Sequence, residues 1–370
     1  MKIALLSFHN AANYGAALQA YALQQFLLNQ NLDCEYLNYV NSSRKNGYNM
    51  IYHIIDSLKK GNILEALKYL LGTPFMTFRK RSFKKFYKNN LRVSNQLYRT
   101  QVEASATNLI YDKFIVGSDQ VWCPENNGND ISYLLSFVKD SHKKISYSSS
   151  FGLATIPESL RNDYKHCLNE IMYLSTRERY GCKLIKELTG RDAQLVLDPV
   201  FLLENKVWSD MIPERNNNKF IFAYTNRSEQ LSSFLRQTQY SLNRKKIYKL
   251  SRQTSPFDFL NPKIKVMYSM KPETFLQSIR DAEFVVTASF HCLAFSIIFH
   301  KPFVCFLTGN AGKDERIVGL LTELGLLDRV FNEKIDSNIM NKNIDWIVVD
   351  EKVNKLALVS KNFLLNSIFA

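Results

Sequence analysis

Short apolar runs alternate with longer amphipathic stretches over the first 200 residues of the chain. The first run, Lys2 to Ser7, predicts a buried strand, followed by a loop over residues 8–14 and a helix from about residue 15 to 30. Four later runs have strand character as well, with helical patterns between them: 32–39, 113–117, 144–148 and 194–199. Strands that alternate with helices predict a doubly wound parallel sheet.

The same alternation returns after a polar stretch. Residues 213–219 can bury almost nothing, so they are the best candidate for a linker. Beyond them, strands are expected at 219–225, 246–250, 284–288 and 302–307. We therefore predict an α/β fold of two Rossmann-like domains that face a cleft in the GT-B-like arrangement, with domains at 1–212 and 219–350.

Two further segments fall outside this repeat. Residues 44 to about 105 carry helical patterns rich in Lys, Phe and Tyr, which predict a helical insertion in the first domain. Residues 351–370 are amphipathic and predict a C-terminal helix that is long enough to pack back on the N-terminal domain.

The composition is that of a globular protein. The chain has 370 residues, of which 46% are hydrophobic, and a mean hydropathy of -0.22, which fits two domains of ordinary size. The apolar run at the N-terminus is too short for a signal peptide, and no stretch approaches the length of a spanning helix. The six cysteines include no CxxC pair and no metal-ligand spacing. We expect a cytoplasmic protein with reduced cysteines and no metal.

The net charge of +14 calls for an anionic partner, which is a phosphorylated metabolite, an acidic glycan, an anionic lipid surface or a nucleic acid. The densest basic stretch, residues 78–88, interleaves Phe and Tyr with Arg and Lys and contains no acid. As a helix it would place the aromatics on one side and the bases on the other. A surface helix that packs its aromatics into the core is the favoured interpretation, and a patch that contacts the inner face of a membrane is the alternative.

The loop after the first strand joins a strand end to the start of a helix. Such a junction offers backbone N–H groups and the helix dipole to an anion. Asn13 and Gly15 are the residues expected there. Asn13 is equally suited to capping the helix and Gly15 to close packing, so ligand contact and a structural role both remain open.

Polar and aromatic residues follow the strand that ends at Gly117. Ser118, Asp119, Gln120 and Trp122 offer hydroxyl, carboxylate and amide groups to sugar hydroxyls, and a flat ring for stacking. This combination favours a sugar-binding loop over a simple turn.

Arg177 stands where another apolar run ends. A guanidinium grips a carboxylate or a phosphate with two parallel bonds, so this position suits an anion clamp. An ion pair with Glu178 or another acid is the structural alternative. Asp198 ends the 194–199 run in the same way, either as a cap or facing the cleft.

The strongest local pattern is in the second domain. A β-branched strand ends in Thr-Ala-Ser, and His291 stands where the next helix begins. An imidazole at a helix N-terminus can bind a phosphate or move a proton near neutral pH. Further on, residues 309–316 predict a flexible loop that enters a helix, with Lys313 and Arg316 as clamps for an anion.

Taken together, these segments resemble the polysaccharide pyruvyl transferase family, from the first strand to about residue 329. The resemblance rests on the order and spacing of five segments: 13–20, 116–122, 175–178, 196–199 and 289–291. It implies transfer of the enolpyruvyl unit of phosphoenolpyruvate to two sugar hydroxyls in cell-surface polysaccharide synthesis, which gives a cyclic ketal and releases phosphate. It implies no metal and no other cofactor.

The resemblance also implies roles for individual residues. His291 is expected to act as general acid or phosphate ligand, and Asp119 as base or acceptor binder. Donor binding is expected from Arg177, Ser289, Asn13, Gly15, Lys313 and Arg316, and acceptor binding from Ser118, Gln120, Trp122 and Asp198. The expected partners are phosphoenolpyruvate and a sugar acceptor, which in one alternative is linked to a lipid. No nucleic acid is expected as a partner.

Two positions depart from the family pattern, which reads Thr-Asp-Ser-Phe-His-Gly. Ala288 replaces the Asp, and Cys292 replaces the Gly. Some branches also carry an Arg where this chain has Ser289, so one donor-binding charge has to come from another basic residue: Lys271, Lys313 or Arg316. These changes are compatible with three alternatives: an altered donor, an altered acceptor or lost activity.

Two other functions fit parts of the pattern. A GT-B glycosyltransferase would use the same cleft for a sugar nucleotide, so the donor distinguishes the two enzymes. A noncatalytic binder of acidic glycan or nucleic acid would use the positive charge, but the chain shows neither a nucleic-acid motif nor a continuous basic stripe.

Overall fold

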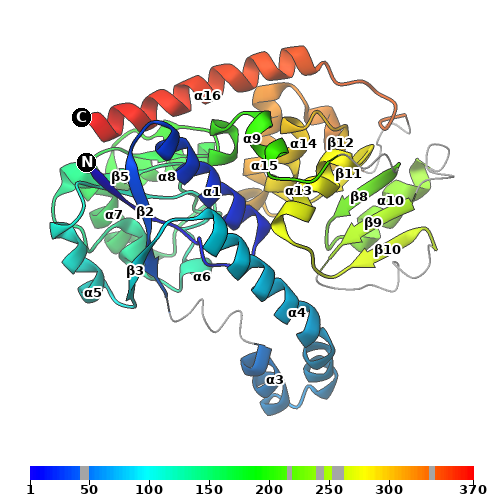
Figure 1. Ribbon diagram of the computed structural model, residues 1–370, viewed down its shortest axis with the longest axis horizontal. Coiled ribbons are helices and arrows are strands. Elements are labelled where there is room, and N and C mark those ends of the chain that lie inside the picture. Colours follow the sequence, from blue (N-terminus) through cyan, green and yellow to red (C-terminus); the bar gives the residue numbers. More distant parts are fainter. Residues whose placement is uncertain (42–49, 215–218, 239–245, 252–261, 333–337) are drawn as a thin grey trace. The chain divides into compact units, whose positions relative to one another are not determined.

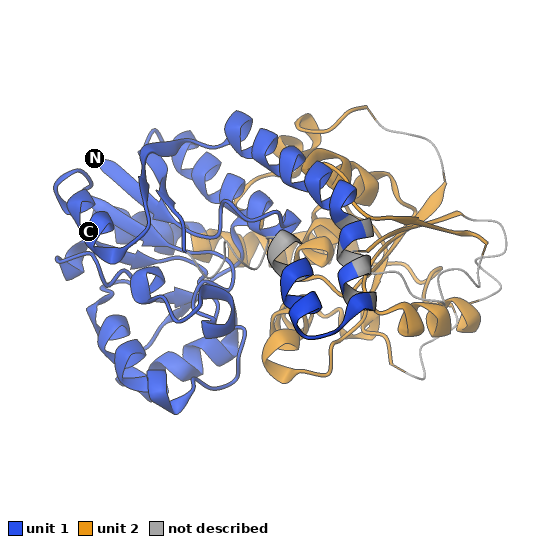
Figure 2. Ribbon diagram, turned by 90° about the horizontal axis from the view of Figure 1, so that it is seen from below, with its two compact units in different colours: residues 1–199, 361–370 blue, residues 200–360 orange. Residues whose placement is uncertain are grey.

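The protein is described from a computed structural model, which covers residues 1–41, 50–214, 219–238, 246–251, 262–332 and 338–370. The chain divides into two compact units, drawn in different colours in Figure 2. Unit 1 comprises Met1–Pro199 and Lys361–Ala370, and unit 2 comprises Val200–Ser360. The predicted linker at 213–219 falls largely on residues 215–218, which lie outside the described residues.

A parallel sheet of five strands forms the centre of unit 1 (Figure 1). Its order is β3-β2-β1-β4-β5, with the strands β1 (Lys2–Leu6), β2 (Asp33–Tyr39), β3 (Val93–Tyr98), β4 (Lys113–Val116) and β5 (Lys144–Ser146). A short parallel pair, β6 (Ser175–Thr176) and β7 (Gln194–Leu195), continues from it through the bridges of Ile145 with Tyr173 and of Ser149 with Thr176. The runs predicted at 2–7, 32–39, 113–117 and 144–148 are therefore strands of one sheet, while the run at 194–199 is extended for two residues only.

The segment predicted as a helical insertion, residues 44–105, is not helical throughout. It contains the helices α3 (Met50–Lys59), α4 (Ile63–Asn90) and α5 (Gln101–Ser105), but β3 lies between α4 and α5 and pairs with β2. An edge strand has one neighbour, and only Ser94 and Tyr98 of β3 are buried. The strand therefore lacks the apolar alternation by which the sequence would have revealed it.

The helix α1 (Tyr14–Asn29) is buried along almost its whole length. Its sequence is mostly apolar and rich in Ala, which allows close packing, and its buried Gln19 and Gln24 form hydrogen bonds inside the unit. Three further helices of unit 1 are shorter than α1: α6 (Pro124–Asn127), α7 (Arg161–Glu170) and α8 (Arg179–Thr189). Leu6, Leu37, Phe114 and Val116 of the sheet pack with Trp122 and Leu168 in one apolar core.

Unit 2 repeats this topology. Its parallel sheet has the order β10-β9-β8-β11-β12, with β8 (Phe220–Tyr224), β9 (Lys246–Leu250), β10 (Ile264–Met267), β11 (Phe284–Thr287) and β12 (Phe303–Cys305). Four of these strands were predicted and β10 was not. The described helices of the unit include α9 (Asn205–Asp210), α10 (Ser228–Gln237), α13 (Pro272–Asp281), α14 (Phe290–Ile298) and α15 (Ala311–Leu324). Both units are thus Rossmann-like sheets with the same relative strand order.

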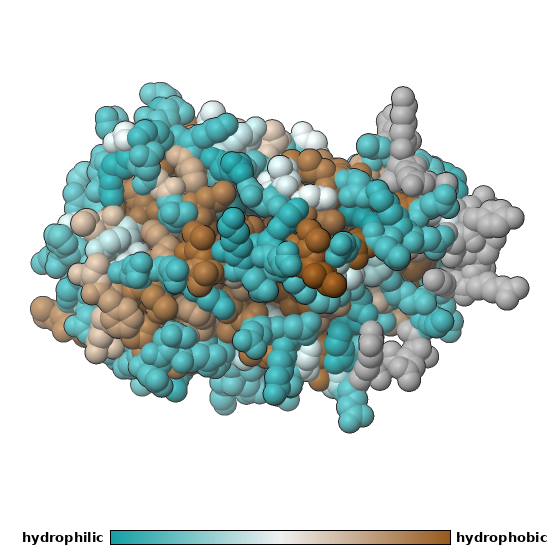
Figure 3. Space-filling model, turned by 90° about the horizontal axis from the view of Figure 1, so that it is seen from above, coloured by the Kyte–Doolittle hydropathy of each residue, from teal (hydrophilic) through white to brown (hydrophobic). Residues whose placement is uncertain are grey.

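The C-terminal helix α16 (Trp346–Phe369) begins five residues before the predicted start at residue 351. It keeps several large apolar side chains exposed, including Leu358 at 59% and Ile347 at 75%. The face drawn in Figure 3 accordingly mixes hydrophobic with hydrophilic side chains. Within the described part of the chain, no helix combines the length and apolarity needed to cross a bilayer.

Candidate functional site

The candidate residues lie where ligands bind in doubly wound sheets. In such sheets the ligand site is outside the carboxyl ends of the strands, at the point where the strand order reverses. That point falls between β1 and β4 in unit 1 and between β8 and β11 in unit 2. The loops at Asn13, Ser118 and His291 each follow one of these four strands. The parallel sheets therefore bring the sequence motifs of each unit to one edge.

Asn13 caps helix α1. Its side-chain oxygen accepts hydrogen bonds from the backbone N–H groups of Gly15 at 2.9 Å and Ala16 at 3.3 Å. These are the amides that the sequence offered to an anion, so the capping alternative is the one that the structure shows. Gly15 is buried in the first turn, where its lack of a side chain allows close packing.

Helix α4 holds the same loop from the other side. Arg79 is 1% exposed and donates from Nε to the carbonyl oxygen of Ala12 at 2.8 Å, with its guanidinium carbon 4.4 Å from the centre of the Tyr14 ring. Tyr87 donates from its hydroxyl to the carbonyl oxygen of Ala11. The helix predicted at 78–88 does bury Phe83, but the buried Arg79 departs from a simple division into an aromatic and a basic face.

The turn after β4 is tied to the turn after β1 by buried polar groups. Gln19 donates to the Ser7 hydroxyl at 2.9 Å and accepts from the Ser118 N–H at 3.1 Å, while the Ser7 hydroxyl donates to the carbonyl oxygen of Ser118 at 3.0 Å. Gly117 has a φ of +123°, and a Cβ there would lie 2.1 Å from the carbonyl oxygen of Tyr147. Only glycine fits this position, and the network fixes where the residues after it begin.

Arg177, Asp198 and Asp119 form a buried ion cluster at the carboxyl edge of unit 1. One terminal nitrogen of Arg177 donates to the Asp198 carboxylate, and the other lies 3.4 Å from Asp119 Oδ1. The Ser118 hydroxyl lies 3.1 Å from Asp198 and 3.3 Å from Arg177. Burial alone would lower the pKa of the Arg177 guanidinium, but the carboxylates of Asp198 and Asp119 outweigh it and hold that pKa above its usual value.

The cluster therefore contains the ion pair that the sequence left open as an alternative for Arg177. Its acid partners are Asp198 and Asp119 in place of Glu178. One guanidinium and two carboxylates carry a formal charge of -1, and the Arg177 side chain is only 1% exposed. A cluster of this charge does not attract an anion, so the geometry does not favour Arg177 as a direct clamp for phosphate or carboxylate.

Glu178 binds backbone N–H groups of the segment after β5. Its carboxylate accepts from the backbone N–H of Phe151 at 2.8 Å and of Gly152 at 3.2 Å, and from the Ser150 hydroxyl at 2.7 Å. The residue is 3% exposed. It therefore fixes the segment that follows β5, which lies beside the turn carrying Asp119 through the Asp119–Ser149 bridge.

The acceptor-binding prediction is wrong for Trp122. Its indole is fully buried, donates from Nε1 to the carbonyl oxygen of Tyr133 and packs on Phe151, with ring centres 5.0 Å apart. A ring inside the core has no free face for a sugar. The aromatic residue that the sequence pattern offered for stacking is a core residue instead.

The remaining residues of this loop differ in accessibility. Ser118 and Asp198 are at most 1% exposed, so both serve the buried network described above. Gln120 is half-buried, and the Asp119 side chain keeps 17% of its surface exposed. Asp119 and Gln120 are thus the predicted acceptor residues that a substrate can reach in this conformation.

His291 is the second residue of helix α14 and is 8% exposed. Ser289 caps this helix by accepting from the Cys292 N–H at 3.5 Å, and its own N–H donates to the Thr287 hydroxyl at 3.0 Å. The edge of the imidazole packs against Phe290. The structure thus places His291 in the first turn of a helix at the carboxyl edge of unit 2, as the sequence predicted.

Cys292, one of the two departures from the family pattern, faces the interior. Its burial raises the pKa of the thiol to about 12, although a hydrogen bond with Thr287 acts in the opposite direction. A neutral, fully buried thiol behaves as a small apolar side chain. Ala288 is half-buried, and its N–H donates to the carbonyl oxygen of Tyr224 at 3.2 Å.

The predicted loop at 309–316 is shorter than expected. Helix α15 starts at Ala311, with Asn310 as its cap, so Lys313 and Arg316 lie in its first two turns. The buried Asp314 accepts from the N–H groups of Thr308 and Gly309, both at 2.8 Å, and so closes the preceding turn. An N-terminal Asn followed by Asp and Glu is a helix-start pattern that could have located this boundary.

Sequence patterns did not identify a buried lysine at the carboxyl edge of unit 2. Lys249 lies in β9, is 0% exposed and contacts the hydroxyl of Ser228, the first residue of α10. A lysine inside an apolar strand was the available signal, because buried lysines are rare without partners. In the described residues no group of three or more His, Cys, Asp or Glu side chains is placed to hold a metal ion.

Comparisons with known proteins agree with the sequence and the topology. The family model described as polysaccharide pyruvyl transferase matches residues 13–310. A search of curated proteins found no match. The match of the family model covers the candidate residues from Asn13 to His291, and Lys313 and Arg316 lie beyond its end.

Solved structures with the same architecture include three UDP-N-acetylglucosamine 2-epimerases. That of Rickettsia bellii is 10% identical, with a TM-score of 0.56 over 100% of this chain and 96% of that chain. That of Neisseria meningitidis, bound to UDP-GlcNAc, is 7% identical, with a TM-score of 0.52 over all of both chains. A putative one from Listeria monocytogenes is 10% identical, with a TM-score of 0.52 over 97% and 91%. At such identities the likeness shows the fold, which is the predicted GT-B-like one.

Proposed function

The chain belongs to the polysaccharide pyruvyl transferase family, and on this premise we propose that it moves the enolpyruvyl unit of phosphoenolpyruvate onto two hydroxyls of a sugar. The carbon–oxygen bond to phosphate and the π bond to the methylene carbon break, and two carbon–oxygen bonds to the sugar and one carbon–hydrogen bond form. One hydroxyl proton balances the proton added to carbon, and the other leaves with the phosphate. The family match, which spans the candidate residues from Asn13 to His291, is the observation that carries this proposal.

The reaction needs a proton, a base and cations. The methylene carbon of phosphoenolpyruvate takes up a proton to become a methyl group, and each attacking hydroxyl gives up its own. Developing negative charge on the departing phosphate needs positive charge or N–H donors nearby. In our proposal His291 delivers the proton from the first turn of α14, and Lys313 and Arg316 in the first turns of α15 hold the donor anion.

Asp119 serves as base for the acceptor hydroxyl. Its carboxylate is partly exposed, and its Oδ1 accepts from the N–H of Gln120 at 2.9 Å and lies 3.4 Å from Arg177. A base has to be positioned before it can act, and a buried guanidinium fixed by a second carboxylate is a rigid support. We therefore assign Arg177 as the residue that positions Asp119, in place of the donor clamp suggested by the sequence.

The proposal also concerns the carrier of the acceptor sugar and the place in the cell where the enzyme acts. A sugar in cell-surface polysaccharide synthesis is carried by a lipid or by a nucleotide. Among the residues of helices α3 and α4 whose burial is described, six large apolar side chains are exposed: Ile55, Leu58, Ile63, Leu70, Phe75 and Phe78. The last of these adjoins the basic stretch 79–88, and apolar side chains next to bases suit the surface of an anionic membrane. We propose peripheral contact of this helix pair with the inner face of the membrane.

The activity is tested by phosphate release from phosphoenolpyruvate in the presence of a panel of sugar nucleotides and lipid-linked sugars. Release that depends on one acceptor, with a ketal-bearing product in the mass spectrum, supports the proposal. Asp119→Asn is expected to abolish it and Gln96→Ala, an exposed change on β3, to leave it intact. Transfer of a sugar instead of pyruvate would identify the GT-B glycosyltransferase that remains the alternative.

A further inference from the structure

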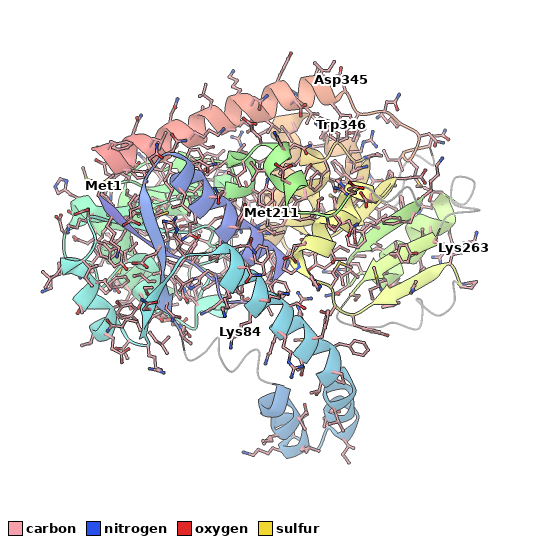
Figure 4. All side chains as sticks on the ribbon, viewed as in Figure 1. Met1, Lys84, Met211, Lys263, Asp345 and Trp346 are labelled. Atoms are coloured by element: carbon pink, nitrogen blue, oxygen red, sulfur yellow. The ribbon has the colours of Figure 1, made fainter. Side chains whose placement is uncertain are left out.

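The carboxamide of Gln120 is held between helix α6 and the segment that follows β5. Its Oε1 accepts a hydrogen bond from Nδ2 of Asn126, on α6, at 3.0 Å. Its other end lies on Gly152, where an added Cβ would come 2.1 Å from Gln120 Nε2 and 2.8 Å from Cδ. All three residues belong to unit 1, and Figure 4 draws the side chains around them on the cyan-to-green part of the ribbon. One neighbour thus holds the oxygen of the amide, and the other lies against its nitrogen.

The backbone at Gly152 is anchored from two sides. The buried carboxylate of Glu178 accepts from the Gly152 N–H at 3.2 Å. Two residues earlier, the N–H of Ser150 donates to the carbonyl oxygen of Asp119 at 3.0 Å. This segment therefore cannot retreat from the turn beside it. A side chain added at Gly152 would displace the end of Gln120, because a flexible side chain moves at a lower cost than an anchored backbone.

The same arrangement determines which end of the amide a ligand meets. In the part of the chain that the structure describes, no acceptor bonds to Nε2 of Gln120, so its N–H groups are available to a ligand. The preceding residue, Asp119, offers a partly exposed carboxylate. An ionised carboxylate only accepts hydrogen bonds and an amide nitrogen only donates them, while a hydroxyl does both. These consecutive side chains thus offer one acceptor and one donor to the hydroxyls of a sugar.

We propose that Asp119 and Gln120 bind the two acceptor hydroxyls that the ketal joins, and that Gly152 and Asn126 are the positioning residues that make this possible. The inference rests on the proposed function and identifies what selects the acceptor. The Asp119 carboxylate accepts from the hydroxyl whose proton it takes, and Nε2 of Gln120 donates to the oxygen of the other. A sugar in which the second hydroxyl is absent or substituted loses one of the two hydrogen bonds.

Asn126 sets the direction of the amide. Its Nδ2 donates to the oxygen of Gln120, which leaves the nitrogen for the acceptor. A carboxylate at position 126 would accept from the nitrogen instead, so the amide would turn and present its oxygen to the sugar. Asn126→Asp keeps the size and shape of the side chain. It therefore changes the group that faces the acceptor without removing Gln120.

The experiment measures KM and kcat of the whole chain by phosphate release from phosphoenolpyruvate. The acceptor probes are UDP-glucose, UDP-galactose, UDP-N-acetylglucosamine and undecaprenyl-diphosphate-linked N-acetylglucosamine. The variants are Gly152→Ala, Gln120→Ala, the two combined, and Asn126→Asp. Gly190→Ala is the matched control, since Gly190 has a φ of +73° against +62° for Gly152, but no atom lies within 4 Å of an added Cβ. Thermal unfolding checks that each variant is folded.

We expect Gly152→Ala to raise the KM for the acceptor about ten-fold, the loss of one hydrogen bond, and the KM for phosphoenolpyruvate by less than about two-fold. Gln120→Ala should raise the acceptor KM by the same factor. Adding Gly152→Ala to it should change nothing further, because the group to be displaced is already absent. Asn126→Asp should match Gln120→Ala, and Gly190→Ala should match the wild type.

Three outcomes would overturn the inference and leave the proposed function intact. The first is that the effects of Gly152→Ala and Gln120→Ala multiply in the combined variant. The second is that Gly152→Ala and Gly190→Ala behave alike, and the third that Gln120→Ala or Asn126→Asp leaves the acceptor KM unchanged. The last comparison decides the matter if Gly152→Ala does not fold. A wild type that releases no phosphate with any of the probes would refute the proposed function, and the inference with it.

Discussion

Arg177 donates to Asp198 in the interior of unit 1, and neither side chain exposes more than 1% of its surface. The pair joins the residue directly after β6 to the segment that follows β7, and Ser118 adds the turn after β4. Three strand ends thus meet at one charge pair. Such a pair fixes geometry more than it adds stability, because the desolvation of both charges offsets most of their attraction.

Removal of one partner of this pair is expected to be costly. Arg177→Met leaves the Asp198 charge buried without its cation and should lower the free energy of unfolding by about 3–5 kcal/mol. Arg177→Met/Asp198→Asn removes the stranded charge as well and should recover part of that loss. Urea unfolding of both variants measures the difference. A double variant that is less stable than Arg177→Met alone would contradict the assignment.

The turn at Gly117 is expected to tolerate no side chain. Gly117→Ala places a Cβ against the carbonyl oxygen of Tyr147 and should cost about 3 kcal/mol or more. Gly190, at the end of α8, also has a positive φ, +73°, but no atom lies within 4 Å of an added Cβ. Gly190→Ala should cost only about 1 kcal/mol. Similar thermal unfolding temperatures for the two variants would rule out a steric requirement at Gly117.

Arg79 is expected to matter for stability more than its neighbours in the basic stretch. Arg79→Gln loses the bond to Ala12 and the contact with the Tyr14 ring, which together should cost about 2–3 kcal/mol. Arg81→Gln alters an exposed side chain and should change the free energy of unfolding by less than about 0.5 kcal/mol. Chemical denaturation of both variants measures the two changes in the free energy of unfolding. Equal changes would mean that Arg79, like Arg81, is only a surface charge.

If α3 and α4 contact a membrane, binding of the protein to vesicles should depend on anionic lipid and on the exposed apolar side chains of these helices. The wild type should sediment with vesicles that contain anionic lipid, and less so at high salt. Phe75→Ser/Phe78→Ser should weaken this partition by about ten-fold or more. Leu358→Ser, on the exposed side of α16, is the control. Equal loss in both variants, or no binding to anionic vesicles, would exclude the helix pair as the contact.

The sequence predicted the sheets because their central strands are continuous apolar runs. Phe114 and Val286, for example, lie in strands that are buried on both faces, and both runs were recognised. The edge strand Val93–Tyr98 was missed because it buries only Ser94 and Tyr98 and so shows no apolar alternation. Helix Trp346–Phe369 was predicted too short because its first turns keep apolar residues exposed.

The sequence predicted where the candidate residues lie relative to the strands better than it predicted which of them contact one another. That Asp119, Arg177 and His291 follow strand ends could be inferred from local patterns. Which groups neutralise one another could not, since Arg177 and Asp198 come together only through the parallel order of the strands. Trp122 shows the same limit, because a polar turn around an aromatic residue is compatible with a ring that points outward or into the core.

The central claim is that phosphoenolpyruvate is the donor, and calorimetric titration of the wild type with phosphoenolpyruvate and with a panel of sugar nucleotides tests it most directly. Lys313→Gln serves as donor-site variant and Lys355→Gln, an exposed change on α16, as control. We predict saturable phosphoenolpyruvate binding that Lys313→Gln weakens by about 1.5 kcal/mol, the scale of one charge-assisted bond, and that the control leaves unchanged. Binding of a sugar nucleotide with no binding of phosphoenolpyruvate would contradict the account.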